Sequence, residues 1–384
     1  MKSWRVIFLT VLIIVLGFPN PHSVLDAVVT VALGLYITVV VFSSKRFKFN
    51  SIWFVIPIII LFLISSIING RQVRAYLIRE PVAETYRTDM DDFLKTYYLM
   101  KNGRDYYSAF KQAVIQNAFK TTVSNNLWSW RLPTIFYIWQ LFPSAIFLYA
   151  GFLLLCSFAL LTSLFIGQEL LPSKYNYLGI LAPYLLYSYL HFAARDSTLL
   201  QTEWWGMFCL LFGMFFWFKK NFSLAVLFIT LTVLVRELFI VPLLIMTIIA
   251  FKQKQNWRAL AVPGIILVLF MLLHFFWVAR QIPITPSLFV LRTHTFNKQI
   301  ILPTLAFASW EYIWNRLRIF IIFFGLGLVG ILFKRKQAGW LWLSFFIFPL
   351  SFLFIGSSVY NDYWGILYMP FVILAVPSFV GIFA

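Results

Sequence analysis

A cluster of carboxylic acids follows the third long apolar run of the chain, in the segment Thr88-Asp89-Met90-Asp91-Asp92-Phe93. Acids packed this closely repel one another when ionised, which raises the pKa of at least one and suits a general base. A structural role explains part of the pattern, because Thr88 and Asp91 have capping-box spacing and acids favour the first turn of a helix. The capping interpretation accounts best for Asp91 and least for Asp89.

Two arginines lie beside apolar runs, where they could hold an anionic group. Arg131 belongs to the segment Trp130-Arg131-Leu132-Pro133-Thr134, and Arg195 precedes Asp196 in the polar segment 191–203. The guanidinium group is a planar, permanently charged donor that matches the oxygens of a phosphate. The alternatives are structural: Arg131 as an anchor at the membrane surface, and Arg195 as the local partner of Asp196.

Four further polar side chains have the chemistry to hold a sugar. Gln201 and Glu203 stand at the start of an apolar run, where an amide and a carboxylate can hydrogen-bond hydroxyl groups. Asp362 and Tyr363 lie between the last two apolar runs, where a carboxylate beside an aromatic ring combines hydrogen bonding with stacking. An aromatic belt at a membrane interface explains Tyr363 equally well.

Arg236 and Glu237 interrupt the apolar run 222–251 at its midpoint. Lysines flank both ends of the run, so the positive-inside rule places both ends in the cytoplasm and the run must cross twice. Each half is only about 14 residues, or roughly 21 Å of helix, against a hydrocarbon core of roughly 30 Å. We therefore expect two short helices, with Arg236 facing a cavity and contacting a ligand or an acid of another helix. We do not expect it to pair with Glu237, because adjacent helix positions do not face each other. A single tilted span is the alternative.

Metal and nucleotide cofactors are not expected. The sequence has no P-loop and no glycine-rich dinucleotide fingerprint. Its histidines and cysteines show no ligand spacing, and both cysteines lie inside apolar runs as inert buried thiols. These residues are His22, His191, His274, His294, Cys156 and Cys209.

The composition excludes a soluble globular protein, a disordered chain and a disulfide scaffold. Of the 384 residues, 61% are hydrophobic and only 11% are charged, whereas about 25% are charged in a typical soluble domain. The net charge of +18 is spread over short clusters between apolar runs, which favours membrane orientation and anionic lipids over nucleic acid. The sequence therefore predicts an all-α, polytopic membrane protein, with 1–384 as a single transmembrane domain.

The apolar runs predict about twelve membrane-spanning helices. The first begins like a signal peptide but lacks a small-residue cleavage site, so we expect it to be retained. Four basic clusters lie in loops between apolar runs, around residues 45–48, 219–220, 252–258 and 334–336. The positive-inside rule places the loops that carry them on the cytoplasmic side. Of the 13 acids, only Glu169 falls on that side. The expected spans are 6–18, 24–43, 51–69, 143–166, 177–192, 204–218, 222–235, 238–251, 259–279, 317–333, 339–356 and 364–384.

Two loops are too long and polar to be simple connectors, and both are expected outside the cytoplasm. Loop 70–142 contains two helical patterns: one near Thr88, with Phe93, Tyr97 and Met100 on one side, and one at about 105–120. We expect these helices to lie in the membrane interface. The second loop, 280–316, carries Arg280, Arg292, His294, Lys298 and Glu311.

The acidic motif and its surroundings resemble the GT-C superfamily of membrane glycosyltransferases. In that family an acid in the first long outer loop precedes an aromatic residue by about four positions and a glycine by about fourteen, as Asp89 precedes Phe93 and Gly103 here. This chain departs from the family in having two extra runs before the usual first span and no Asp-Glu pair. The resemblance implies that Asp89 is the catalytic base, with Asp91 as second choice.

The same resemblance implies a function. The chain would be a hexosyl- or pentosyltransferase of the plasma (inner) membrane and cell envelope, with its active site facing the extracytoplasmic side. It would move a sugar, with inversion, from a polyprenyl-phosphate donor to a hydroxyl group of a glycan, lipid or protein acceptor. The partners would be these substrates and membrane lipids, with no cofactor, no metal and no nucleic acid.

Two other classes of membrane protein remain as alternatives. A transporter or flippase for a lipid-linked or anionic substrate would also have about twelve spans, but the sequence shows no internal repeat between its halves. A polymerase or ligase of surface polysaccharide would use a pyrophosphate-linked donor. Such proteins hold their large catalytic loop late in the chain, whereas here it comes early.

Overall fold

The chain folds into helices joined by short turns. A computed structural model describes residues 2–21, 23–43, 51–79, 88–115, 127, 130–282, 320–334, 337–355 and 359–383. Within these ranges the chain forms sixteen α-helices and no β-strand. The all-α fold class is therefore confirmed.

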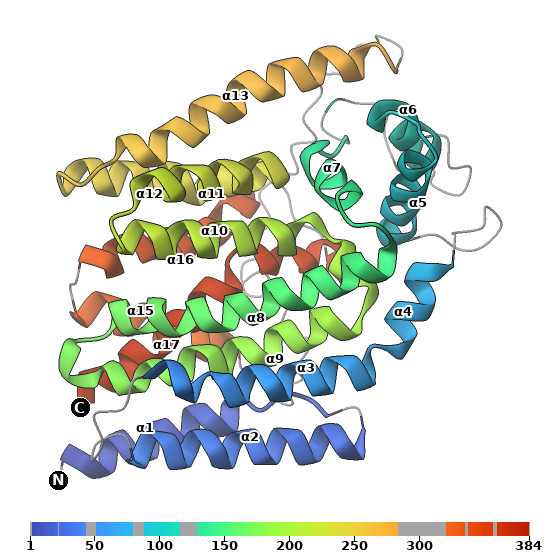
Figure 1. The fold of residues 1–384 in the computed structure, drawn as a ribbon. Coiled ribbons are helices and arrows are strands. Elements are labelled where there is room, and N and C mark those ends of the chain that lie inside the picture. Colours follow the sequence, from blue (N-terminus) through green and yellow to red (C-terminus); the bar gives the residue numbers. More distant parts are fainter. Residues whose placement is uncertain are drawn as a thin grey trace.

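Most helices run roughly parallel or antiparallel to one another in one bundle (Figure 1). Each of the twelve predicted apolar runs corresponds to one of them, because uninterrupted apolar residues satisfy their backbone groups only within a helix. These helices are α1 (Lys2–Leu16), α2 (Val24–Ser43), α3 (Ile56–Asn69), α8 (Ala145–Leu170), α9 (Leu181–Arg195), α10 (Thr202–Phe218), α11 (Phe222–Val235), α12 (Ile240–Lys252), α13 (Arg258–Ala279), α15 (Phe320–Lys334), α16 (Gln337–Ile355) and α17 (Met369–Phe383).

Four of the described helical segments are long and apolar enough to cross a membrane: Val24–Ser43, Ile52–Asn69, Ala145–Leu170 and Arg258–Ala279. Several other apolar helices have only 10–17 residues. The membrane class of the protein is thus supported by length and composition, and a full set of twelve crossings stays a prediction.

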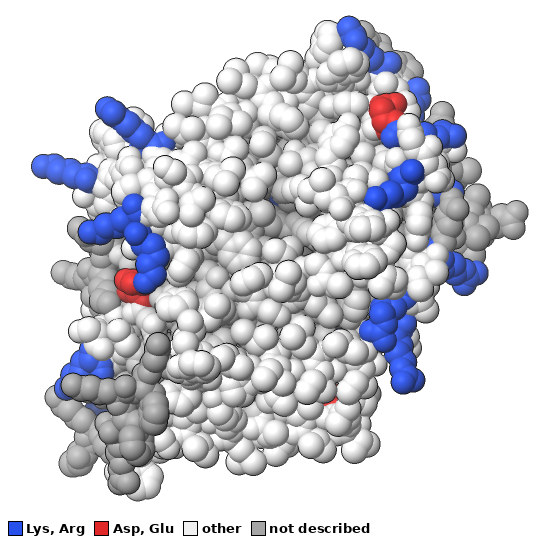
Figure 2. All heavy atoms as spheres, viewed as in Figure 1, with Lys and Arg blue, Asp and Glu red and all other residues white. Residues whose placement is uncertain are grey.

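The outer surface of the bundle is apolar. On α13, Leu269, Leu272 and Leu273 are each about 60% exposed, an arrangement that suits lipid and is unfavourable in water. Figure 2 shows a broad, nearly uncharged band, with lysine and arginine side chains gathered at the two ends of the molecule. This banding is what a membrane-embedded bundle requires.

One end of the bundle, which we call the cap end, carries the helices of loop 70–142 (Figure 1). They are α4 (Arg71–Ile78), α5 (Asp89–Lys101), α6 (Tyr106–Phe110) with a following π-helical turn to Ile115, and α7 (Thr134–Gln140). The opposite end, the basic end, carries the α10–α11 and α12–α13 turns with their lysines.

The first helical pattern of the loop is confirmed as α5, and Phe93, Tyr97 and Met100, which were predicted to share one side of the helix, are all buried. The second pattern is helical over residues 106–115, and its remaining residues lie outside the described ranges. The same holds for most of the second loop, from residue 283 to 316. Whether the helices lie in a membrane interface stays a prediction.

Candidate functional site

The candidate site begins at a break between two short helices. Helix α11 ends at Val235, and α12 begins at Ile240 after the 3₁₀ turn Glu237–Phe239 (η6). Arg236 has extended backbone angles, φ −145° and ψ 103°, so the helix stops there. The two-short-helix prediction is confirmed, and the single tilted span is excluded.

Arg236 lies in the protein interior, with 1% of its surface exposed. Its Nε lies 2.7 Å from Oε1 of Glu203, at the start of α10, which is an ion-pair distance. Its Nη1 also donates to the carboxylate of Glu237. The expected acid from another helix is therefore present, but the prediction that Glu237 would not be a partner was wrong. That prediction assumed that both residues lie in one helix, whereas α11 ends before Arg236 and the long arginine side chain reaches the carboxylate of Glu237.

A glycine allows α10 to approach this break closely. A Cβ added to Gly206 would lie 2.7 Å from the ring of Phe239 and 3.2 Å from Cβ of Arg236. Any other residue there would push α10 away from the break. The close approach brings Glu203, three residues earlier, within reach of the guanidinium.

Arg131 comes from a different part of the chain and joins the same group. Burial alone would lower the pKa of its guanidinium, but Tyr363 and the carboxylate of Glu203 act in the opposite direction. Glu237 and Asp89 add to this effect, and together these groups hold the pKa of Arg131 above its usual range. Arg131 is thereby kept as a cation that faces several acids.

Arg131 is held in place by aromatic residues of the cap helices. Its guanidinium carbon lies 6.0 Å from the centre of the Phe93 ring on α5. Its backbone carbonyl accepts a hydrogen bond from the buried hydroxyl of Tyr106 on α6. Phe136 of α7 packs edge-on to Phe93 and also contacts Tyr106. Three cap helices thus position one arginine.

Tyr363 completes the group from the far end of the sequence, in the 3₁₀ segment Val359–Leu367 (η10). Burial raises the pKa of its phenol, and the positive charges of Arg131 and Arg236 oppose the shift. The carboxylates of Glu203 and Asp89 also act on it. We call Asp89, Arg131, Glu203, Arg236, Glu237 and Tyr363 the charged cluster; its members come from five segments of the chain.

The acids of α5 have three different environments. Asp89 is partly exposed at the first helical position, where its charge acts on Arg131 and Tyr363. Asp91 forms the capping box with Thr88: its Oδ2 accepts from the backbone N–H of Thr88 at 2.7 Å. Its Oδ1 accepts from the hydroxyl of Tyr76 at 2.8 Å. Asp92 is fully buried. The capping interpretation thus accounts for Asp91, which is better placed as a helix cap than as a base.

The remaining predicted site residues are less closely tied to the cluster. Gln201 is buried immediately before α10, two residues from Glu203. Arg195 is partly exposed in the last turn of α9, with its guanidinium carbon 5.8 Å from the centre of the Phe192 ring. The backbone of Asp362 lies in η10 beside Tyr363, and its side chain is outside the described part of the structure.

A group of adjacent rings beside the cluster, formed by Tyr107, His274 and Trp277, was not predicted from the sequence; we call it the aromatic wall. The hydroxyl of Tyr107 lies 3.2 Å from Nδ1 of His274 on α13, and its ring stacks on Trp277. The charge of Glu237 also acts on His274. The contact with Tyr107 gives this buried histidine a hydrogen-bond partner at Nδ1. The sequence shows only an isolated histidine in an apolar run, and this pattern does not indicate which residue contacts it.

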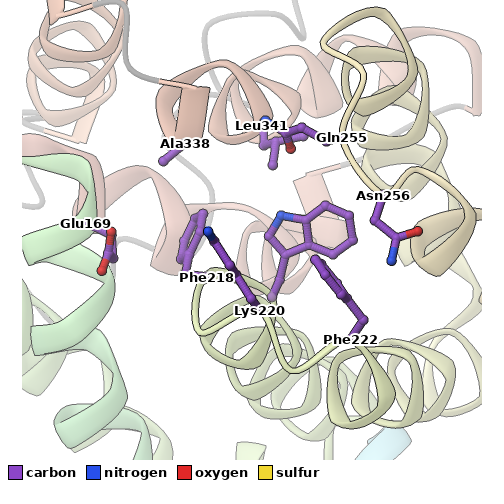
Figure 3. A pocket seen from close by; sticks show the side chains of 9 residues that line it. Glu169, Phe218, Lys220, Phe222, Gln255, Asn256, Ala338 and Leu341 are labelled. Carbon is purple, nitrogen blue, oxygen red and sulfur yellow. The ribbon is translucent and has the colours of Figure 1, made fainter.

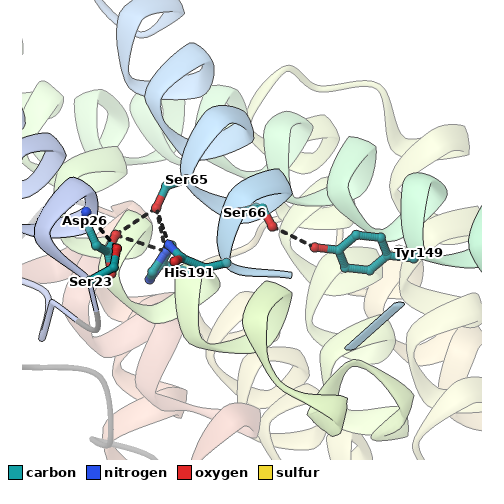
Figure 4. A network of polar contacts seen from close by, with 7 residues as sticks. Ser23, Asp26, Ser65, Ser66, Tyr149 and His191 are labelled. Atoms are coloured by element: carbon teal, nitrogen blue, oxygen red, sulfur yellow. Dashed lines mark hydrogen bonds and ion pairs between the residues drawn. The ribbon is translucent and has the colours of Figure 1, made fainter. Parts of the chain in front are cut away.

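A second buried polar network lies between α2, α3 and α9 (Figure 4). Ser65 Oγ donates to Oδ1 of Asp26 at 2.7 Å and lies 2.8 Å from Nε2 of His191. The same Nε2 lies 3.4 Å from Oδ1 of Asp26. A nucleophilic triad needs the two ring nitrogens to serve different partners, whereas here one nitrogen meets both. The network is therefore a polar tie between helices, and sequence reasoning did not foresee it.

Among the described residues, no group of three or more His, Cys, Asp or Glu side chains could hold a metal ion.

Comparison with known proteins adds no relative. No family model matches the chain, and neither a curated protein nor a solved structure does.

Proposed function

We propose that this chain is an integral membrane glycosyltransferase that uses a polyprenyl-phosphate sugar as donor. The proposal rests on the charged cluster, in which the charge of a partly exposed acid, Asp89, acts on a cationic arginine, Arg131, at the cap end. A transferase needs a base for the acceptor hydroxyl and a cation for the departing phosphate. The cluster supplies both.

Asp89 is the proposed base. Its carboxylate takes the proton of the acceptor hydroxyl while that oxygen forms a bond to the anomeric carbon of the sugar. The bond between the anomeric carbon and the phosphate oxygen breaks, and the polyprenyl phosphate leaves with the electron pair. A single displacement of this kind inverts the anomeric centre.

Arg131 is the proposed phosphate ligand, in preference to Arg236. Two carboxylates already neutralise Arg236 by direct contact, with Glu203 at 2.7 Å and Glu237 on its Nη1. Among the described residues, Arg131 contacts an aromatic ring, and the acids act on it through their charges. Its guanidinium donors are therefore the better placed to meet an anionic group.

The location of the cluster supports a lipid-linked donor. The cluster lies where the cap helices meet the apolar bundle, so a polyprenyl chain could lie in lipid beside α13 while its phosphate reaches Arg131. The outer aromatic wall of Tyr107 and Trp277 offers rings on which a sugar can stack. The extracytoplasmic orientation of this end remains part of the proposal.

The test is a transfer assay on the purified full chain with polyprenyl-monophosphate and polyprenyl-pyrophosphate sugars. We expect release of polyprenyl phosphate from the monophosphate donor in detergent, where no membrane gradient exists. Arg131→Gln should raise the donor concentration needed for half-maximal rate by roughly tenfold, since a charge-assisted hydrogen bond to the phosphate is lost. Activity only with the pyrophosphate donor would favour a polymerase or ligase, and vesicle uptake without donor cleavage would favour a transporter.

A further inference from the structure

A pocket of about 430 Å³ opens at the basic end, opposite the charged cluster. It lies where the ends of α8, α10, α11 and α16 meet the α12–α13 turn. Its base contains buried Trp217 and Leu341, with Phe218 and Phe222 beside them. Its rim is polar and exposed. An apolar base beneath a polar rim is the usual build of a ligand site.

The rim presents hydrogen-bond donors from facing sides. Figure 3 shows Lys220 on one side of the pocket and Asn256 on the other. Gln255 stands beside Asn256, and its amide nitrogen donates to Oε1 of Gln253 at 2.8 Å. An ammonium group and side-chain amides at such a rim can together hold the oxygens of a phosphate.

Two adjacent lysines in this turn have different roles. The ammonium of Lys219 lies 5.3 Å from the centre of the Phe165 ring and 5.9 Å from that of Phe215. Lys220 instead has φ +58°, a left-handed conformation that a helix end usually gives to glycine. A lysine in that position turns its side chain away from its neighbour, toward the rim of the pocket.

The electrostatic environment favours an anion. The described residues of the basic end include Lys174, Lys219, Lys220, Lys252, Lys254 and Arg258. Against them stands one acid among these described residues, Glu169, at the edge of the pocket. The excess of positive charge at the border of the apolar band is the pattern that attracts anionic lipid headgroups.

We propose that this pocket binds the phosphate-bearing headgroup of an anionic membrane lipid. Lys220 and Asn256 hold the phosphate oxygens, and Trp217 and Phe222 contact the apolar part next to the glycerol. The site lies at the opposite end from the charged cluster, and it does not depend on the proposed transferase activity.

The test is native mass spectrometry of the purified full chain titrated with dihexanoyl phosphatidylglycerol. Parallel titrations use dihexanoyl phosphatidylcholine and inorganic phosphate. Lys220→Gln removes the charge at the rim, and Ala338→Trp fills the pocket from α16. Lys254→Gln is the matched control, because Lys254 is also exposed, at the same end and in a left-handed conformation, φ +56°.

We expect one saturable phosphatidylglycerol site that Lys220→Gln weakens roughly fivefold, that Ala338→Trp abolishes and that Lys254→Gln leaves unchanged. Equal losses in the two lysine variants would show diffuse attraction and overturn the proposal. Equal binding of phosphatidylcholine, or of inorganic phosphate alone, would overturn it as well. Thermal unfolding verifies that each variant is folded, and if Ala338→Trp is not, the two lysine variants decide.

Discussion

The two ends of the molecule treat charge in opposite ways. At the cap end, Arg236 is buried and paired with Glu203 and Glu237, and Arg131 faces acids from distant segments. At the basic end, Lys252 and Lys254 are exposed. Exposed lysines at membrane borders orient a chain and need no partner, whereas buried ion pairs carry a desolvation penalty. The exposed lysines of the basic end are explained by membrane orientation, whereas the buried charges of the cap end need a further explanation, such as a functional role.

Asp89 should give the largest loss of activity of any residue at the cap end. Asp89→Asn removes a proton acceptor at nearly constant size, so transfer should fall roughly 10²–10⁴-fold while donor binding is retained. The measurement is the initial rate of sugar transfer beside donor binding. Asp91→Asn is the control, because its cap helps to hold α5 and its loss should lower stability more than rate. Normal activity of Asp89→Asn would remove the base from the proposal.

The two ends should also differ in what the loss of an acid does to stability. Glu203→Leu leaves the buried Arg236 without one of its two partners, which should cost about 3–5 kcal/mol. Glu169→Leu removes an exposed acid at the basic end and should change stability by about 0.5 kcal/mol or less. Thermal unfolding in detergent measures both variants. Equal effects would mean that the Arg236–Glu203 pair contributes no more than a surface charge.

The cap end and the basic end should lie on opposite sides of the membrane. A cysteine introduced at Ser108, on α6, should react with an impermeant thiol reagent added outside the cell. A cysteine at Asn221, in the α10–α11 turn, should react only after the membrane is opened. The native cysteines give little background because Cys156 is buried and Cys209 is only partly exposed, within α10. Labelling of the Asn221 site alone from outside would place the charged cluster in the cytoplasm.

The helix cap formed by Asp105 at α6 should make a small contribution to stability. Asp105 precedes α6, and its Oδ1 accepts from the backbone N–H groups of Tyr107 and Ser108 at 3.0 and 3.1 Å. Its slight burial opposes ionisation, but hydrogen bonds from Ser108 and Tyr107 outweigh it and lower the pKa of Asp105 below its ordinary value. The cap therefore stabilises the fold above the ordinary carboxylate pKa, and this stability is lost as pH falls through the lowered value.

Asp105→Ala should reduce stability at neutral pH by about 1 kcal/mol. Asp105→Asn can still cap the helix, so it should retain most of that stability and lose the dependence on pH. Unfolding midpoints between pH 3 and 7 measure both effects. An unchanged pH profile in Asp105→Asn would show that another group titrates.

The sequence was most informative where a one-dimensional pattern controls the structure. Apolar runs located the bundle helices, and the lysines on either side of residues 222–251 required the break at Arg236. The capping box at Thr88 was readable because Asp91 lies three residues away. Contacts between distant segments were not readable, since no local pattern brings Ser65 and Asp26 to His191, or Tyr363 to Arg131. The pairing of Arg236 with Glu237 depends on one extended residue, which composition does not encode.

The break at Arg236 has a consequence for how the chain is assembled. Protein chains are made from the N-terminus, so Glu203 leaves the ribosome before Arg236 does. An arginine entering the bilayer without a partner is costly, but α10 already offers its carboxylate when the α11–α12 hairpin arrives. The order of residues thus places the carboxylate of Glu203 in the protein before its partner Arg236 is inserted. A circular permutation that reversed this order would make the hairpin insert with Arg236 paired to Glu237 alone.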